Sequence, residues 1–217
     1  MLNFPFDLPY GSLLNYIPNK KYDQAQKSRE VIAKVKSGNE KIIKQIISLI
    51  DERPIAEALK HFLTPRALLV PIPRSSLMMT GSVWPSKIIA EEMIKQGYGQ
   101  QVKYMLERRI AVRKSSQQSS EDRPSIKEHI DSLHICAPAE LTDPETIILV
   151  DDVVTKGSIA IACFECLRNI YPDHRFMLFT IAKTQGFGGT GELDALAPHT
   201  ELFAIMKVVT VIETRAK

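Results

Sequence analysis

Apolar residues in this 217-residue chain change their spacing along the sequence. In the first third they recur every three or four residues, as on one face of an amphipathic helix. This pattern predicts a helix from Asp23 to Lys36, a second one capped by Asn39, and a third opening at Pro54. The second helix carries an apolar stripe formed by Ile43, Ile46, Ile47 and Ile50. Residues 1–20, which are rich in proline and aromatic residues, are expected to be an irregular lead-in.

Short continuous apolar runs beyond residue 66 predict buried strands. They lie at 67–72, near 101–106, at 146–150, at 176–182 and near 202–212. Helices are expected from Pro85 and over Ile159–Ile170. Strands that alternate with helices are typical of a parallel sheet covered on both faces. We therefore expect an α/β protein, with a doubly wound, mostly parallel sheet in residues 66–217 and a helical addition in residues 1–65.

The most informative stretch is 146–158, where a buried strand leads into two acids, a short loop and a helix. Carboxylates accept hydrogen bonds, so Asp151 and Asp152 can hold two sugar hydroxyls. Neighbouring side chains of an extended strand point to opposite faces, so the chain must turn here for both acids to engage. The alternative is an ordinary buried strand that ends in a solvated Asp-Asp turn.

The loop after the acids suits a phosphate. The start of a helix offers unpaired backbone N–H groups and the positive end of the helix dipole. Glycine lets the backbone approach the anion closely, while hydroxyls and a lysine add donors and charge. These features come from Thr155, Lys156, Gly157 and Ser158. Acids and loop together predict a site for a phosphorylated sugar.

Residues 146–158 resemble the phosphoribosyl-diphosphate (PRPP) signature of the type I phosphoribosyltransferases. In that family the acid pair holds the ribose 2- and 3-hydroxyls and the loop wraps the 5-phosphate. The resemblance implies these roles for Asp151 and Asp152 and for Thr155 to Ser158, within a type I phosphoribosyltransferase fold. Lys156 is a departure, since most members have Thr or Ala there, although members that make amino-sugar phosphates carry Arg.

A wider resemblance is to the ComF-type branch of this family. It rests on Ser28–Ile43, on Val70-Pro-Ile-Pro73, and on an Arg…Gln…Arg spacing. The spacing is formed by Arg113, Gln117 or Gln118, and Arg123. Many ComF-type proteins begin with a four-cysteine zinc module, which this chain lacks, and this weakens the case for a role in DNA uptake.

The resemblance implies that the loop after the first predicted strand holds the pyrophosphate of PRPP, with Arg74 and Ser75 as its binding residues. A solvated loop residue is the alternative for Arg74. It also implies that Mg²⁺ is carried mainly by the diphosphate, ribose hydroxyls and water, with no protein metal site. The polar segment Glu107–Glu128 is either a lid over bound PRPP, contributing Arg113 and Arg123, or a surface loop with solvated charges.

The function that these likenesses imply is enzymatic: Mg²⁺-dependent transfer of the 5-phosphoribosyl group from PRPP to a nucleobase or amine. Arg74, Arg113 and Arg123 are the candidate catalytic residues. The alternative is a non-catalytic module that senses PRPP or a nucleotide and acts through a partner in DNA uptake, repair or regulation. The acceptor is not indicated by the sequence, and a homodimer or a protein partner is left open.

Composition adds limits to this interpretation. A net charge of +3 with 24% charged residues suits anionic ligands without indicating nucleic acid as a direct ligand. No apolar run reaches membrane-spanning length, and the N-terminus lacks the pattern of a signal peptide. Three cysteines give no disulfide framework, so we expect a cytoplasmic protein.

Two further motifs have competing interpretations. Cys163-x-x-Cys166 has the spacing of a redox motif, but it falls inside a predicted helix, which favours structural cysteines. The segment Gly186–Gly191 fits a dinucleotide-binding pattern, yet Pro198 interrupts the helix that this pattern should open, which favours a loop.

Overall fold

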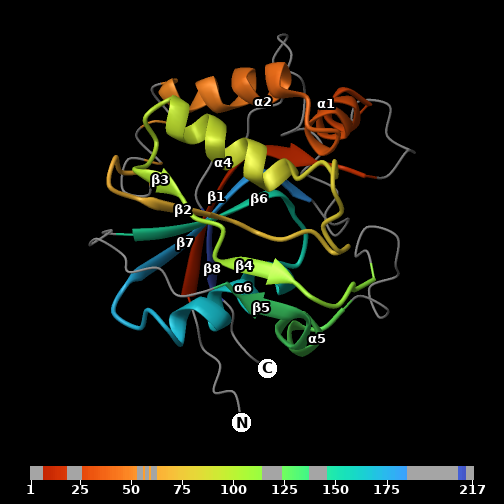
Figure 1. Cartoon of the computed structure of the whole chain (residues 1–217). Coiled ribbons are helices and arrows are strands. Elements are labelled where there is room, and N and C mark those ends of the chain that lie inside the picture. Colours follow the sequence, from red (N-terminus) through yellow and green to blue (C-terminus); the bar gives the residue numbers. More distant parts are fainter. Residues whose placement is uncertain are drawn as a thin grey trace.

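The computed structural model describes residues 7–18, 26–52, 56, 59, 63–113, 124–136, 146–184 and 210–213. Within these ranges a central sheet runs through the molecule, with α1, α2 and α4 on one face and α5 and α6 on the other (Figure 1). The expected α/β class, with a mostly parallel sheet and flanking helices, is confirmed. No helix of the described part is long and apolar enough to cross a membrane.

The central sheet has the strand order β3-β2-β6-β7-β1-β8. Its strands are β1 (Asp7–Tyr16), β2 (Leu68–Pro71), β3 (Gln101–Val102), β6 (Thr146–Val154), β7 (Arg175–Thr184) and β8 (Thr210–Glu213). Every neighbouring pair from β3 to β1 is parallel, and β8 adds antiparallel to β1. Because the strands of a parallel sheet end at the same edge, the loops that leave β2 and β6 start close together.

A second, antiparallel sheet pairs β4 (Leu106–Arg108) with β5 (Leu133–Ile135). The strand predicted near 101–106 is therefore divided: its first two residues form β3 and its last begins β4. The interpretation of Glu107–Glu128 as one polar loop segment was wrong at both ends. Arg108 lies buried in β4, and a helix begins just after Ser125.

Apart from α5 and η2, the helices of the described part follow the predicted pattern. They are α1 (Gln26–Lys36), α2 (Glu40–Ile47), the short 3-10 helix η2 (Ser48–Asp51), α4 (Pro85–Lys95), α5 (Ile126–Ser132) and α6 (Ser158–Arg168). Gly38 ends α1 in the left-handed conformation at φ 75°. The Asn39 side chain then accepts a 3.1 Å hydrogen bond from the Ile42 N–H group and caps α2. Asp23 and the helix opening at Pro54 lie outside the described residues, except Ala56 and Leu59.

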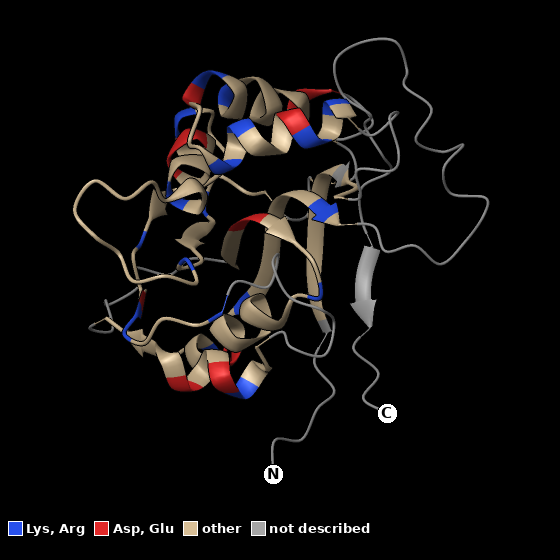
Figure 2. Ribbon diagram, turned by 90° about the vertical axis from the view of Figure 1, so that its right-hand side faces the viewer, with Lys and Arg blue, Asp and Glu red and all other residues tan. Residues whose placement is uncertain are grey.

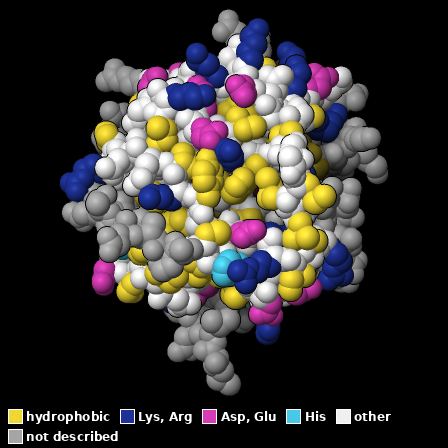
Figure 3. Space-filling view, in the orientation of Figure 1, with side chains coloured by type: hydrophobic (Ala, Val, Ile, Leu, Met, Phe, Trp, Pro, Cys, Tyr) yellow, Lys and Arg dark blue, Asp and Glu magenta, His cyan; other side chains and the backbone are white. Residues whose placement is uncertain are grey.

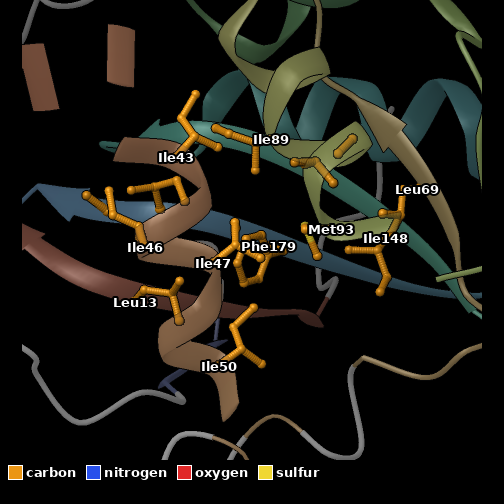
Figure 4. Close-up of a cluster of buried hydrophobic side chains, with 14 of the residues drawn as sticks. Leu13, Ile43, Ile46, Ile47, Ile50, Leu69, Ile89, Met93, Ile148 and Phe179 are labelled. Carbon is orange, nitrogen blue, oxygen red and sulfur yellow. The ribbon is translucent and has the colours of Figure 1, made fainter. Parts of the chain in front are cut away.

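One hydrophobic core fills the space between the sheet and helices α1, α2 and α4 (Figure 4). The predicted stripe of α2 faces it, and its side chains are 0–2% exposed: Ile43, Ile46, Ile47 and Ile50. Burial of one such side chain contributes about 2 kcal/mol. We call this cluster the α2-side core.

The opposite face of the sheet packs on α6, and we call this cluster the α6-side core. Ile147 and Leu149 of β6 point into it, whereas Ile148 and Val150 point into the α2-side core. This alternation is what a strand buried on both faces requires. The continuous apolar run of the sequence therefore predicted β6 correctly.

The interpretation of residues 1–20 as an irregular lead-in was wrong, because Asp7–Tyr16 forms β1 beside β7. Pro9 and Gly11 disfavour a strand in sequence-based reasoning. In the structure Pro9 faces the sheet-edge strand β8, and Gly11 leaves room for Leu59, whose Cδ2 would lie 2.8 Å from an added Cβ. The division at residue 65 remains a prediction.

The outer surface is charged mainly on its helices, as Figure 2 shows. Across the middle of the face in Figure 3, hydrophobic side chains lie between charged ones. The loop that joins β2 to α4 contributes exposed apolar side chains, namely Leu77, Met78, Met79 and Val83.

Candidate functional site

The C-terminal edge of the sheet brings two predicted site segments together. Pro71 of β2 lies opposite Val150 of β6, and the Ile72 N–H group donates a 2.9 Å hydrogen bond to the Val150 carbonyl oxygen. Asp151 follows Val150 directly, and Arg74 follows Ile72 by two residues. The acid pair and the predicted pyrophosphate loop therefore start side by side.

The strand β6 continues through both acids to Val154, four residues beyond the predicted end. Its regular alternation is interrupted there, because Val150 and Val153, three residues apart, both pack against the α2-side core. The Asp152 N–H group donates a 2.9 Å hydrogen bond to Oδ1 of Asp151. The two carboxylates interact, although the pairing of β6 with β7 continues past them to Val154.

The two acids have different surroundings. Asp151 is 9% exposed, and burial raises its pKa well above the usual value, with a further increase from the Asp152 carboxylate. Asp152 forms an ion pair with Lys36, whose Nζ lies 2.8 Å from Oδ2 of Asp152. Burial lowers the pKa of Lys36, but Asp152, together with Asp151 and Tyr16, outweighs this effect, so the net shift is upward.

The loop after the acids leads into a helix, as the sequence predicted. Gly157 is buried, adopts the left-handed conformation at φ 77°, and is the N-terminal cap of α6. An added Cβ would lie 3.8 Å from Val154, so the conformation rather than lack of space calls for glycine. Thr155 and Ser158 are half-buried and Lys156 is exposed. The unpaired N–H groups of the first turn of α6 therefore start at an accessible loop, as a phosphate site needs.

The Arg74 loop is held by its own backbone contacts. Nη1 of Arg74 donates a 2.6 Å hydrogen bond to the Val83 carbonyl oxygen, and Nε1 of Trp84 donates to the Ile72 carbonyl oxygen at 2.8 Å. The Ser75 carbonyl oxygen accepts from the Val112 N–H group at 2.9 Å. Arg74 and Ser75 are both half-buried, so the loop is ordered at its start, and its arginine points along the loop toward Val83.

Of the remaining predicted arginines, Arg113 is described by the structure and Arg123 is not. Arg113 forms a 3.3 Å ion pair with Glu128, and both side chains are exposed. Glu128 belongs to the capping box of α5, in which it bonds the N–H group of Ser125. Arg123, Gln117 and Gln118 lie outside the described residues, so the lid remains a prediction.

Two residues at this edge were missed by sequence reasoning. Lys36 ends a helix far from β6 in the sequence, and the Lys-Ser-Gly turn that follows it gave no sign of an acid partner. Arg108 lay in a stretch assigned to a polar loop, yet it is 3% exposed and its Nε donates a 2.6 Å hydrogen bond to the Arg74 carbonyl oxygen. The apolar residues Met105 and Leu106 before it were the available signal for burial.

The cysteine pair of α6 has structural surroundings. Cys163 is 0% exposed, and burial raises the pKa of its thiol well above the usual value. Burial also raises the pKa of Cys166. A redox thiolate needs the opposite shift, so the structure favours packing roles. Across the described ranges, no three His, Cys, Asp or Glu side chains gather as a metal site. The Gly186–Gly191 segment lies outside the described residues.

No protein-family model matches this chain, and a search of curated proteins also gives no match. The candidate site therefore rests on its own geometry and on the motif of β6.

Proposed function

We propose that the protein is a phosphoribosyltransferase of the type I fold, which binds PRPP with Mg²⁺ and transfers its 5-phosphoribosyl group to a nucleobase or amine. The observation that carries the proposal is the order of features between Asp151 and Ser158. Two interacting acids at the C-terminal end of a central strand are followed by a left-handed glycine and a helix N-terminus. Ligands of open α/β sheets bind at this edge.

Each part of PRPP has a chemically suitable neighbour in this arrangement. Asp151 and Asp152 accept from the ribose hydroxyls, and the loop from Thr155 to Ser158 with the start of α6 binds the 5-phosphate. The backbone at Arg74 and Ser75 starts beside the acids and suits the diphosphate. Arg74 supplies positive charge to this group after its guanidinium leaves the Val83 carbonyl oxygen.

In the proposed reaction the bond between ribose C1 and the diphosphate oxygen breaks, and the leaving diphosphate keeps the electron pair. A bond forms between C1 and the acceptor nitrogen, which loses one proton. The positively charged character that develops at C1 is stabilised by the nearby Asp152 carboxylate. Mg²⁺ fits through oxygens of the diphosphate, the ribose and water, since Asp151 is buried and Asp152 is already paired with Lys36. When bound, the ion supplies charge neutralisation on the diphosphate.

The first test is ligand-dependent stabilisation. PRPP with Mg²⁺ should raise the melting temperature, because a ligand at about 100 times its dissociation constant adds about 2.7 kcal/mol to stability. The double variant Asp151→Asn, Asp152→Asn should lose this increase. Asp173→Asn, an exposed acid in the turn before β7, is the matched control and should keep it. A wild-type protein that PRPP does not stabilise would overturn the proposal.

The second test is catalysis. Release of inorganic diphosphate from PRPP is measured with a panel of nucleobases and amines, each with and without protein. Turnover with one acceptor class identifies the substrate. If PRPP stabilises the protein but no acceptor in the panel leads to diphosphate release, the result would favour the non-catalytic sensing module over the enzyme.

A further inference from the structure

The C-terminal end of α1 contacts the candidate site at two points. Lys36 in its last turn pairs with Asp152 at 2.8 Å, across 116 residues of sequence. Two residues later, Gly38 packs so closely that an added Cβ would lie 2.7 Å from Cγ1 of Val83. Val83 is the residue whose carbonyl oxygen binds the Arg74 guanidinium. The end of α1 therefore touches both the acid pair and the Arg74 loop.

The ion pair leaves the acids able to bind a ligand. A carboxylate has two oxygens with about four lone-pair positions. Lys36 uses Oδ2 of Asp152, and the backbone N–H group of Asp152 uses Oδ1 of Asp151. Each acid keeps acceptor capacity for a sugar hydroxyl, so Lys36 does not have to leave when a sugar binds.

The charge balance of the acids also depends on this lysine. Burial disfavours the charged form of its ammonium group, whereas Asp152 and Asp151 of β6 and Tyr16 of β1 favour it and raise the pKa of Lys36. Two adjacent carboxylates beside an anionic sugar phosphate would repel it. Lys36 offsets the charge of Asp152, and its side chain is 45% exposed, against 17% for Asp152, so the lysine is the more accessible member of the pair.

We propose that Lys36 is a positioning residue for sugar binding, which holds Asp152 in place and offsets its charge so that the acid pair accepts the two neighbouring hydroxyls of a phosphorylated sugar. The helical N-terminal segment thereby contributes a residue to the site. The identity of the ligand rests on the proposed function, whereas the role of Lys36 rests on its contact with Asp152.

The experiment measures PRPP affinity with Mg²⁺ by calorimetry for the wild type, Lys36→Met and Lys36→Arg. Lys34→Met is the matched control, since Lys34 is an exposed lysine in the same last turn of α1. We expect Lys36→Met to weaken binding about tenfold, and the arginine variant to recover most of the loss because it restores the cation. The control should bind as the wild type does.

A pH series separates positioning from general stability. Lys36 lowers the pKa of Asp151, so without the lysine Asp151 takes up a proton more readily. The affinity deficit of Lys36→Met should therefore grow as the pH falls from 8 to 6. A wild-type protein that fails to bind PRPP overturns the proposed function and this inference with it. A wild type that binds, with Lys36→Met equal to it at every pH, overturns only the role of Lys36.

Discussion

The Nε–H group of Arg108 in β4 donates a 2.6 Å hydrogen bond to the backbone carbonyl oxygen of Arg74. Nη1 of Arg108 donates to Oγ of Ser132, while Nη2 is buried without a hydrogen-bond partner. In the described part of the chain no Asp or Glu forms an ion pair with this guanidinium, and burial lowers its pKa. Burying a cation without an acidic partner costs free energy. The hydrogen bonds of Arg108 offset part of this cost, and they connect the β4–β5 sheet to the Arg74 loop.

Replacement of this guanidinium should therefore destabilise the protein even when the charge is kept. Arg108→Lys loses the planar set of donors that reaches Arg74 and Ser132 together. We expect the free energy of unfolding to fall by about 2 kcal/mol, measured by urea denaturation. Arg109→Lys, at the exposed neighbouring position, is the control and should stay within about 0.5 kcal/mol of the wild type. Equal losses at both positions would contradict the role assigned to Arg108.

Burial of Asp151 should lower the stability of the protein at high pH, although the same residue is proposed to bind PRPP. Burial and Asp152 raise its pKa, so the native state keeps a proton that the unfolded chain releases above pH 3.8. Stability therefore falls as the pH rises through that value, and it continues to fall until the native carboxyl ionises. Asp151→Asn removes this titration and retains an oxygen for the Asp152 N–H group. We expect the variant to gain stability relative to the wild type at pH 7.5 and to lose PRPP binding.

The measurement is urea unfolding of Asp151→Asn and the wild type at pH 4 and pH 7.5. The stability difference between the two proteins should be larger at the higher pH. Asp173→Asn, exposed in a turn, controls for the loss of one acidic residue. If Asp151→Asn is less stable than the wild type at pH 7.5, burial of the ionised Asp151 carboxylate does not destabilise the native state.

The parts of this site that sequence could predict are local ones. The run from Thr146 to Val150 is apolar without interruption, and a strand buried on both faces is the simplest structure for it. Gly157 stands between a loop and a helical pattern, where the left-handed conformation favours glycine. Both features depend on residues close together in the chain, and both occur in the structure.

The parts that could not be predicted depend on long-range contacts. β1 contains Pro9 and Gly11, and only its pairing with β7 and β8 and its contact with Leu59 make it a strand. The pairing of Lys36 with Asp152 arises because the fold brings the end of α1 close to the end of β6, and no local pattern in the sequence predicts this contact. The burial of Arg108 likewise depends on residues from another segment of the chain, so the polar sequence around it did not predict it.

Burial of His129 in α5 should make the stability of the protein sensitive to acid. It is 3% exposed, and burial lowers its pKa to about 4, with a further decrease from Arg108 and an opposing effect of Glu128. Between pH 6.5 and about 4, this histidine is protonated in the unfolded chain but stays neutral in the native state. The free energy of unfolding therefore decreases as the pH is lowered through this range. His129→Gln should lose less stability between pH 7 and pH 4.5 than the wild type, in urea unfolding at constant ionic strength. Parallel pH profiles for the two proteins would contradict this assignment.

A methyl group added at Gly38 should disturb both the fold and the candidate site. Its φ of 75° is strained for alanine, and the added Cβ would lie 2.7 Å from Val83 and 2.9 Å from Ile88. Gly38→Ala should lower the free energy of unfolding by about 3 kcal/mol, in which strain and overpacking both contribute. Gly97→Ala is the matched control, because Gly97 has φ 87° but no heavy atom within 4 Å of its Cβ position, and strain alone costs about 1 kcal/mol. Since Val83 holds Arg74, PRPP affinity should also fall in Gly38→Ala and stay unchanged in Gly97→Ala. Equal stability losses in the two variants would show that the α1–α2 turn is not packed against the Arg74 loop.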